Sequence, residues 1–201
     1  MHGYDEDDNV NLMLRVRAGD EAAFAELVER HRDRVLSVVY RYLRDRDEAE
    51  DLAQEVFLNV YRARESYRPE AKLSTWLYRI TTNLCLNAVR SRKVRSKVQT
   101  LANGSDGDEA RRIEEMPDAT HEPAQKSLEK SELAARVRAA VDELPDNQKT
   151  AVVLNKYEGC SYEDIAEIMS LSIPAVKSLL SRARMNIKER LTPYLQNEKV
   201  S

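Results

Sequence analysis

Hydrophobic positions recur every three or four residues in the N-terminal half of this chain, which is the spacing of amphipathic α-helices. Asp20 can cap a first long helix, and a second follows the polar break at residues 44–47. Pro69 ends regular structure after the second helix, and Ser74 can cap a third long helix. The expected apolar stripes are Phe24, Leu27, Val28, Val35, Val38, Val39 and Tyr42, then Ala49, Leu52, Ala53, Val56, Phe57 and Val60, then Trp76, Leu77, Ile80 and Leu84.

The C-terminal part repeats this pattern in shorter helices. One stripe stops at Pro145, and the next helix is expected over residues 147–157, closed by Gly159. Residues 161–164 read as a capping box ahead of a short helix. Ser172 can then cap a longer final helix. A short helix, a tight turn and a longer helix together predict a helix-turn-helix.

The segment between the two helical parts, residues 98–129, is expected to be a flexible linker. It holds 8 acidic and 3 basic residues, whereas the whole chain has a formal net charge of −3. Its Gly, Pro, Ser and Asp content disfavours a packed structure. The expected fold class is therefore all-α, with two small helical domains at residues 10–97 and 130–195 joined by a flexible acidic linker, the C-terminal domain being a helix-turn-helix.

Composition excludes several classes of protein. With only 5 Gly and 2 Phe, the chain is a poor candidate for a β-sandwich or barrel. No apolar run approaches the roughly 18–20 residues that span a bilayer, and the acidic N-terminus lacks the features of a secretory signal. Cys85 and Cys160 lie far apart without a CxxC spacing. We expect a cytoplasmic protein without direct membrane insertion, disulfide or structural zinc.

The final helix carries a basic face that is a candidate for DNA binding. Lysine and arginine can donate to guanine edges in the major groove, and serine can pair with bases or phosphate. An ordinary solvated basic surface is the alternative explanation. The residues on or beside this face are Lys177, Ser178, Ser181, Arg182, Arg184 and Lys188.

A second basic cluster follows the third helix, where five of the eight residues 90–97 are Lys or Arg. Asn83 and Asn87 lie upstream, four residues apart on one helical face, and asparagine can make bidentate contacts to bases. The rings of Trp76, Tyr67 and Tyr78 could stack on unpaired bases. The combination favours single-stranded or opened nucleic acid, against the alternative of a core tryptophan with two surface asparagines.

A third cluster is acidic and lies at the start of the second helix. No Glu-x-x-His motif accompanies it, so a di-metal site is not expected, and a docking face for a basic partner is the better interpretation. Asp118 and His121 lack further ligands nearby, and His31 on the first stripe is expected to be packed rather than ligating. No P-loop, GxGxxG, GxSxG or HExxH motif occurs, so neither an enzyme nor a cofactor is expected. The acidic residues are Asp45, Asp47, Glu48, Glu50, Asp51 and Glu55.

These three features occur in the order found in extracytoplasmic-function sigma factors of the sigma-70 family, which the chain resembles. Residues 47–57 (DEAEDLAQEVF) resemble the segment that grips the coiled coil of the polymerase β′ subunit. Residues 73–83 (LSTWLYRITTN) resemble the segment that melts and reads the −10 element. Leu144, Pro145 and residues 159–184 resemble the −35 helix-turn-helix, although Ser170 replaces a common turn glycine.

The resemblance implies a role for each cluster. Core polymerase, through its β and β′ subunits, would bind Asp47, Glu48, Glu50, Asp51, Gln54, Glu55 and Phe57. The −10 DNA would contact Trp76, Tyr78, Arg79, Asn83, Asn87, Arg90, Arg92 and Lys93. The −35 DNA would contact Lys177, Ser178, Ser181, Arg182 and Arg184. The linker would thread toward the RNA exit path.

The implied function is that of a sigma factor, which directs core RNA polymerase to promoters and is held inactive by an anti-sigma partner. A near-neutral chain with two weak DNA surfaces gains affinity when both are tethered to one large enzyme. Two alternatives remain open. A transcriptional regulator would bind operator DNA tightly without polymerase, and a helical scaffold would have no DNA role.

Overall fold

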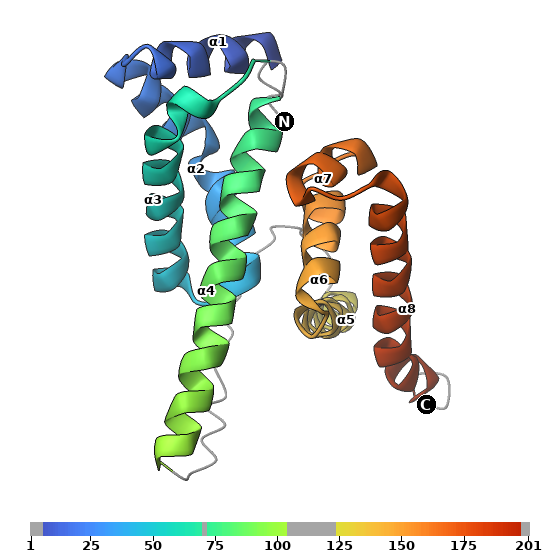
Figure 1. The fold of residues 1–201 in the computed structure, drawn as a ribbon. Helices are drawn as coiled ribbons and strands as arrows, with labels where there is room; N and C mark the ends of the chain where they lie inside the picture. Colours follow the sequence, from blue (N-terminus) through green and yellow to red (C-terminus); the bar gives the residue numbers. More distant parts are fainter. Residues whose placement is uncertain (1–5, 70–71, 104–123, 198–201) are drawn as a thin grey trace. The chain divides into compact units, whose positions relative to one another are not determined.

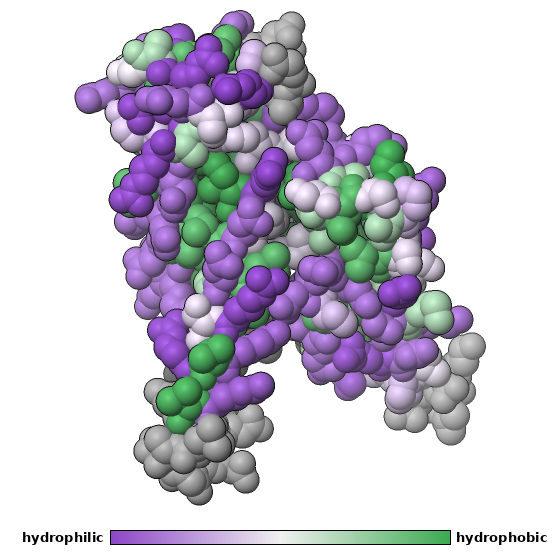
Figure 2. Space-filling view, in the orientation of Figure 1, coloured by the Kyte–Doolittle hydropathy of each residue, from purple (hydrophilic) through white to green (hydrophobic). Residues whose placement is uncertain are grey.

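The computed structural model describes residues 6–69, 72–103 and 124–197, and within these ranges every regular element is helical (Figure 1). The all-α fold class is thereby confirmed. The chain divides into two compact units, Met1–Ile113 and Glu114–Ser201. Each unit has its own buried core, and the face of the molecule shown in Figure 2 is mostly hydrophilic.

The first unit is built around α2 (Glu21–Leu43), which packs against α1 (Glu6–Arg17), α3 (Arg46–Arg62) and α4 (Leu73–Asn103). A single 3₁₀ turn, η1 (Arg64–Ser66), follows α3. Most residues of the first two predicted stripes are buried in one core, whereas Phe24, Val28, Trp76, Ile80 and Leu84 are half-buried. The larger core residues, all less than a tenth exposed, are Leu12, Met13, Val16, Leu27, Val35, Val38, Val39, Tyr42, Leu43, Leu52, Val56, Phe57, Val60, Tyr67, Leu73, Leu77, Tyr78 and Cys85.

Aspartate caps fix where α2 and α3 begin. The side chain of Asp20 accepts a hydrogen bond from the Ala23 N–H at 2.9 Å, which confirms the cap predicted for the first helix. The side chain of Asp45 accepts one from the Glu48 N–H at 3.0 Å. Arg44 turns the chain between the two helices in a left-handed conformation, with φ 54°.

Helix α1 was not predicted from the sequence. It is held by Met13 and Val16, which are fully buried, and by Leu12, which is 3% exposed. These three positions share one helical face, but the stripe is too short to stand out from the acidic residues that precede it. The guanidinium of Arg17 donates to the Tyr67 carbonyl at 3.4 Å, so α1 also contacts the segment that leads into α4.

The boundaries of α4 and α5 (Ala124–Asp142) differ from the prediction. Helix α4 begins at Leu73, with the Trp76 N–H donating to the Lys72 carbonyl, so Ser74 lies in its first turn and does not cap it. Both helices extend into the segment 98–129, because its ends lack the Gly and Pro that mark its middle. The central residues of the linker, 104–123, lie outside the described residues.

The second unit packs α5, α6 (Asp146–Val152) and α7 (Tyr162–Met169) against the long helix α8 (Ile173–Asn197). A π-helical turn, η2 (Val153–Tyr157), continues α6. Gly159 follows at φ 69°, a left-handed conformation that suits glycine, as the sequence predicted for a helix end. The core residues of this unit are Ala140, Val141, Leu144, Ala151, Val152, Val153, Leu154, Ile165, Ala166, Ile168, Val176, Leu180 and Ala183.

Candidate polymerase and promoter interfaces

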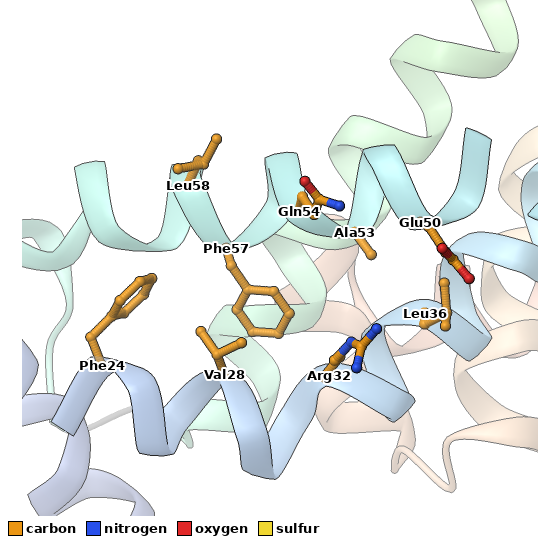
Figure 3. Close-up of a pocket in the computed structure, with 9 residues that line it drawn as sticks. All are labelled: Phe24, Val28, Arg32, Leu36, Glu50, Ala53, Gln54, Phe57 and Leu58. Atoms are coloured by element: carbon orange, nitrogen blue, oxygen red, sulfur yellow. The ribbon is translucent and has the colours of Figure 1, made fainter. Parts of the chain in front are cut away.

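A groove of about 270 Å³ lies between α2 and α3 in the first unit (Figure 3). Figure 3 shows the ring of Phe57 pointing from α3 toward α2, while Leu58 points away from α2. One cation, Arg32, and one carboxylate, Glu50, stand among mainly apolar side chains. The residues that line the groove are Phe24, Val28, Arg32, Leu36, Glu50, Ala53, Gln54, Phe57 and Leu58.

The acidic cluster lies on α3, and of its residues only Glu50 lines the groove, together with Gln54. Asp47, Glu48, Asp51, Gln54 and Glu55 are exposed, and Glu50 is half-buried. These residues share the first three turns of α3, and the two carboxylates of its first turn, Asp47 and Glu48, interact favourably with the positive end of the helix dipole.

Phe57 is buried, whereas its neighbour Leu58 is exposed to solvent. Phe57 is only 6% exposed and forms the floor of the groove, whereas Leu58 is 54% exposed at its edge. The residues predicted to bind core polymerase include Phe57 and not Leu58. Leu58 lies outside the apolar stripe of α3, so helical periodicity did not single it out.

Asparagine and arginine side chains form a continuous exposed row on α4. Arg79, Asn83, Asn87 and Arg90 are all exposed and follow one another by four, four and three residues. Side chains at this spacing lie on one helical face. The structure therefore brings together four of the residues predicted to contact −10 DNA.

Two rings predicted to stack on bases are instead buried in the core. Tyr67 is fully buried and Tyr78 is 3% exposed, because both pack among the helices of the first unit. The face of Tyr78 is closed to a base in this conformation, which corrects its placement among the DNA contacts. Trp76 is half-buried and meets Tyr67 edge to face, with ring centroids 5.4 Å apart.

Arg92 also departs from the prediction. Its side chain is 18% exposed, and its guanidinium donates to the Leu43 carbonyl at 2.8 Å and forms an ion pair with Glu48. Arg92 therefore contacts the corner between α2 and α3 instead of extending into solvent. Its neighbour Lys93 is exposed.

The helix-turn-helix of the second unit consists of α7, the three residues 170–172 and α8. Ser161 and Asp164 form the predicted capping box, each side chain bonding the backbone N–H of the other. Ser170 ends α7 in a left-handed conformation, with φ 53°. The Ser172 hydroxyl then accepts a hydrogen bond from the Ala175 N–H at 3.3 Å, as expected for the cap of α8.

The outer face of α8 is basic along its first four turns. Lys177, Ser181, Arg182, Arg184 and Lys188 are exposed, and Ser178 is half-buried. The opposite face is held by Val176, Leu180 and Ala183 in the core.

A polar contact farther along fixes α8 to α6, because the Asn186 amide donates to Gln148 Oε1 at 2.9 Å. The helix therefore presents its basic face on a rigid support. Rigid support matters because base contacts need a defined geometry.

The described residues form neither a cluster of metal ligands nor a membrane-spanning helix. Among residues 6–69, 72–103 and 124–197, no group of three or more His, Cys, Asp or Glu side chains could hold a metal ion. Asp118 and His121 lie outside the described residues. His31 is 6% exposed within the core of the first unit. No described helix is both long and apolar enough to cross a membrane.

Comparison with known proteins identifies the two units. Residues 27–95 match Sigma-70 region 2, and residues 134–187 match Sigma-70 region 4. The chain is 33% identical over 195 residues to the RNA polymerase sigma-H factor of Pseudomonas aeruginosa, covering 95% of this chain and 97% of that protein. It is 35% identical over 188 residues to the ECF RNA polymerase sigma-E factor of Haemophilus influenzae, covering 92% and 95%.

Solved structures share the fold. CnrH, solved in complex with the cytosolic domain of CnrY, aligns with a TM-score of 0.66 at 22% identity, covering 94% of this chain and 99% of that one. The sigma factor RpoE of Bartonella quintana, solved with the anti-sigma factor NepR, aligns with a TM-score of 0.60 at 23% identity, covering 84% and 96%.

The matches define a sigma-70-type transcription initiation factor with two helical regions. More narrowly, the chain belongs to the extracytoplasmic-function sigma factors. It therefore binds core RNA polymerase and promoter DNA and directs promoter-specific initiation, and it is not an enzyme. The alternatives of an operator-binding regulator and a helical scaffold are excluded by this membership.

Proposed function

We propose that the two units divide promoter recognition between them in the cytoplasm. The unit containing residues 10–97 binds core polymerase and reads the −10 element, and the unit containing residues 130–195 reads the −35 element. The observation that carries this proposal is the row formed by Arg79, Asn83, Asn87 and Arg90. These four side chains are exposed together on α4, while Leu73, Leu77 and Cys85 of the same helix are buried.

Core polymerase docks on the α2–α3 groove and its acidic edge. The groove offers an apolar floor at Phe57 and an exposed leucine at its rim, with Glu50 and Gln54 of α3 among its lining residues. An apolar cavity beside negative charge suits a partner helix with an apolar side chain at its centre and basic residues around it. Such a partner gains affinity from the apolar contact and orientation from the charges.

The exposed row on α4 contacts the −10 region. Asparagine amides can form bidentate bonds with adenine or with an unstacked base, and the arginines at each end can bind phosphate. Arg182 and the serines of α8 contact −35 bases, because the N-terminal turns of a recognition helix enter the major groove. Both surfaces are small, so the chain relies on the polymerase to hold them on one promoter at the same time.

An anti-sigma protein keeps the free chain inactive by covering the α2–α3 groove. The proteins of similar fold include an RpoE solved together with the anti-sigma factor NepR. In this chain, the groove has an apolar floor at Phe57 and leaves Leu58 more than half exposed, so an inhibitor can bury apolar side chains there. Occupation of the groove by an inhibitor would exclude polymerase.

Substitution of Leu58 tests the docking surface. Leu58→Asp places a carboxylate at the rim of the groove, and because the side chain is exposed the fold should persist. We expect core-polymerase affinity to fall about 10-fold and run-off transcription to fall with it. Val94→Asp is the matched control, since Val94 is 61% exposed and does not line the groove. Equal core affinity of the two variants would contradict the proposed docking site.

A further inference from the structure

Arg90 and Arg92 are two residues apart on α4 yet occupy opposite environments. Arg90 is exposed, whereas the Arg92 side chain is 18% exposed. The Arg92 guanidinium contacts Leu43, the last residue of α2, and Glu48, in the first turn of α3. One side chain therefore joins three helices.

Both partners of Arg92 suit a planar cation. The carbonyl of Leu43 is among the last four of α2, which have no partner inside the helix and carry the negative end of its dipole. The Glu48 carboxylate adds a full negative charge. A guanidinium can bond two such acceptors with its fixed fork, whereas an ammonium supplies a single charged point.

The same corner includes a residue that the resemblance assigns to polymerase binding. Glu48 is one of the exposed acids of α3, and Asn87 lies little more than one turn before Arg92 on α4. Beyond the buried packing of α4 on α2 and α3, the Arg92 contact therefore ties the part of α4 that follows the asparagines to both helices. Removing Arg92 from the corner to reach a phosphate would leave the Leu43 carbonyl without this bond.

We propose that Arg92 is a positioning residue that holds the −10-reading face of α4 in register with the polymerase-docking helices α2 and α3, and that it does not contact DNA. This inference rests on the proposed function of the two surfaces. The phosphate contact near this end of α4 comes from the exposed Arg90 instead.

The test compares Arg92→Ala with Arg90→Ala in the full chain assembled with core polymerase on a promoter. Two quantities are measured: the salt dependence of closed-complex formation and the rate of promoter opening, the latter by permanganate reactivity of unpaired thymines. Arg92→Ala should slow opening about 10-fold while the salt slope stays at the wild-type value. Arg90→Ala should lower the salt slope by about 1, as expected for one lost phosphate contact.

A conservative variant separates positioning from general loss of stability. Arg92→Lys keeps the charge near Glu48 but loses the forked geometry, so its opening rate should fall between those of wild type and Arg92→Ala. Fluorescence of Trp76, the single tryptophan, verifies that the first unit is folded in every variant. If Arg92→Ala does not fold, the comparison is made between Arg92→Lys and Arg90→Lys.

Three outcomes are decisive. A salt slope lowered by Arg92→Ala as much as by Arg90→Ala would overturn the inference, because Arg92 would then contact phosphate. Wild-type opening rates in both Arg92 variants would overturn it as well. Failure of the wild-type chain to open any promoter with core polymerase would instead contradict the proposed function, so the two failures are distinguishable.

Discussion

Lys149 Nζ lies 2.8 Å from Asp142 Oδ1, and this ion pair joins the last residue of α5 to α6. The side chain of Lys149 is only 11% exposed and that of Asp142 is 31% exposed. A lysine ammonium is rarely buried without a partner, because removing it from water is costly. The pair fixes the helix junction on which α8 also packs.

Replacing Asp142 should lower stability more than replacing Lys149. Asp142→Ala leaves a largely buried ammonium without its carboxylate, and we expect the free energy of unfolding of the second unit to fall by about 2 kcal/mol. Lys149→Met keeps the buried carbon chain and leaves the carboxylate, the more exposed partner, to water, so its cost should be smaller. Hydrogen exchange of amides in α5 and α6 measures both. Equal losses would contradict the asymmetry.

Ser170 should be replaceable by glycine with a gain in stability. Its φ of 53° lies in the left-handed region, which costs an L-residue of this kind about 1 kcal/mol relative to glycine. Ser170→Gly should therefore raise the free energy of unfolding of the second unit by about 0.5–1 kcal/mol in urea denaturation followed by circular dichroism.

Gly159 provides the matched control for that prediction. It adopts a left-handed conformation at φ 69° with nothing within 4 Å of an added Cβ. Gly159→Ala should therefore destabilise through backbone strain alone, by about 1 kcal/mol. Stabilisation by both substitutions, or by neither, would show that backbone conformation does not decide stability at these turns.

Periodicity and capping residues predicted most of the fold, because they act locally. Asp20, Ser161 and Ser172 all cap the helices that the sequence assigned to them. The π-helical turn at η2 carries no comparable signal, since it depends on how residues after α6 meet the rest of the unit. Tertiary packing also decided that α4 starts at the buried Leu73.

Candidate surfaces were predicted less completely than helices. Spacing alone placed Asn83 and Asn87 on one exposed face, because residues four apart share a face in any helix. Spacing could not show that Arg90 is exposed while Arg92 is largely buried, because Arg92 contacts residues more than forty positions away in the sequence. The buried state of Tyr78 depends in the same way on neighbouring helices. Long-range contacts therefore account for the corrections within the −10 surface.

His31 should make the first unit sensitive to mild acid. Burial, together with the positive charges of Arg34 and Arg30, lowers the pKa of His31 to about 4. In the unfolded chain the imidazole is protonated as pH falls through about 6.5, whereas in the folded chain it is protonated only as pH falls through about 4. The stabilisation is therefore complete above about pH 6.5 and is lost as pH falls toward 4.

Urea unfolding followed by Trp76 fluorescence measures this loss. Between pH 7 and pH 5, His31 alone should lower the free energy of unfolding by about 2 kcal/mol. Carboxylates also change the free energy of unfolding in this pH range. The comparison is therefore made with His31→Leu, which replaces the titratable imidazole by an apolar side chain of similar size. The variant should lose about 2 kcal/mol less than wild type over that interval, and parallel pH profiles would refute the assignment.

Asn83 and Asn87 should act in promoter opening and not in polymerase binding. Both amides are exposed on α4, so replacing them with alanine removes polar groups without creating a cavity. We expect open-complex formation on a cognate promoter to fall about 10-fold or more, because each amide that pairs with a base contributes about 1–3 kcal/mol of recognition. Core-polymerase affinity should stay within about twofold, since neither residue lines the α2–α3 groove. Unchanged transcription by the double variant would remove these asparagines from the −10 surface.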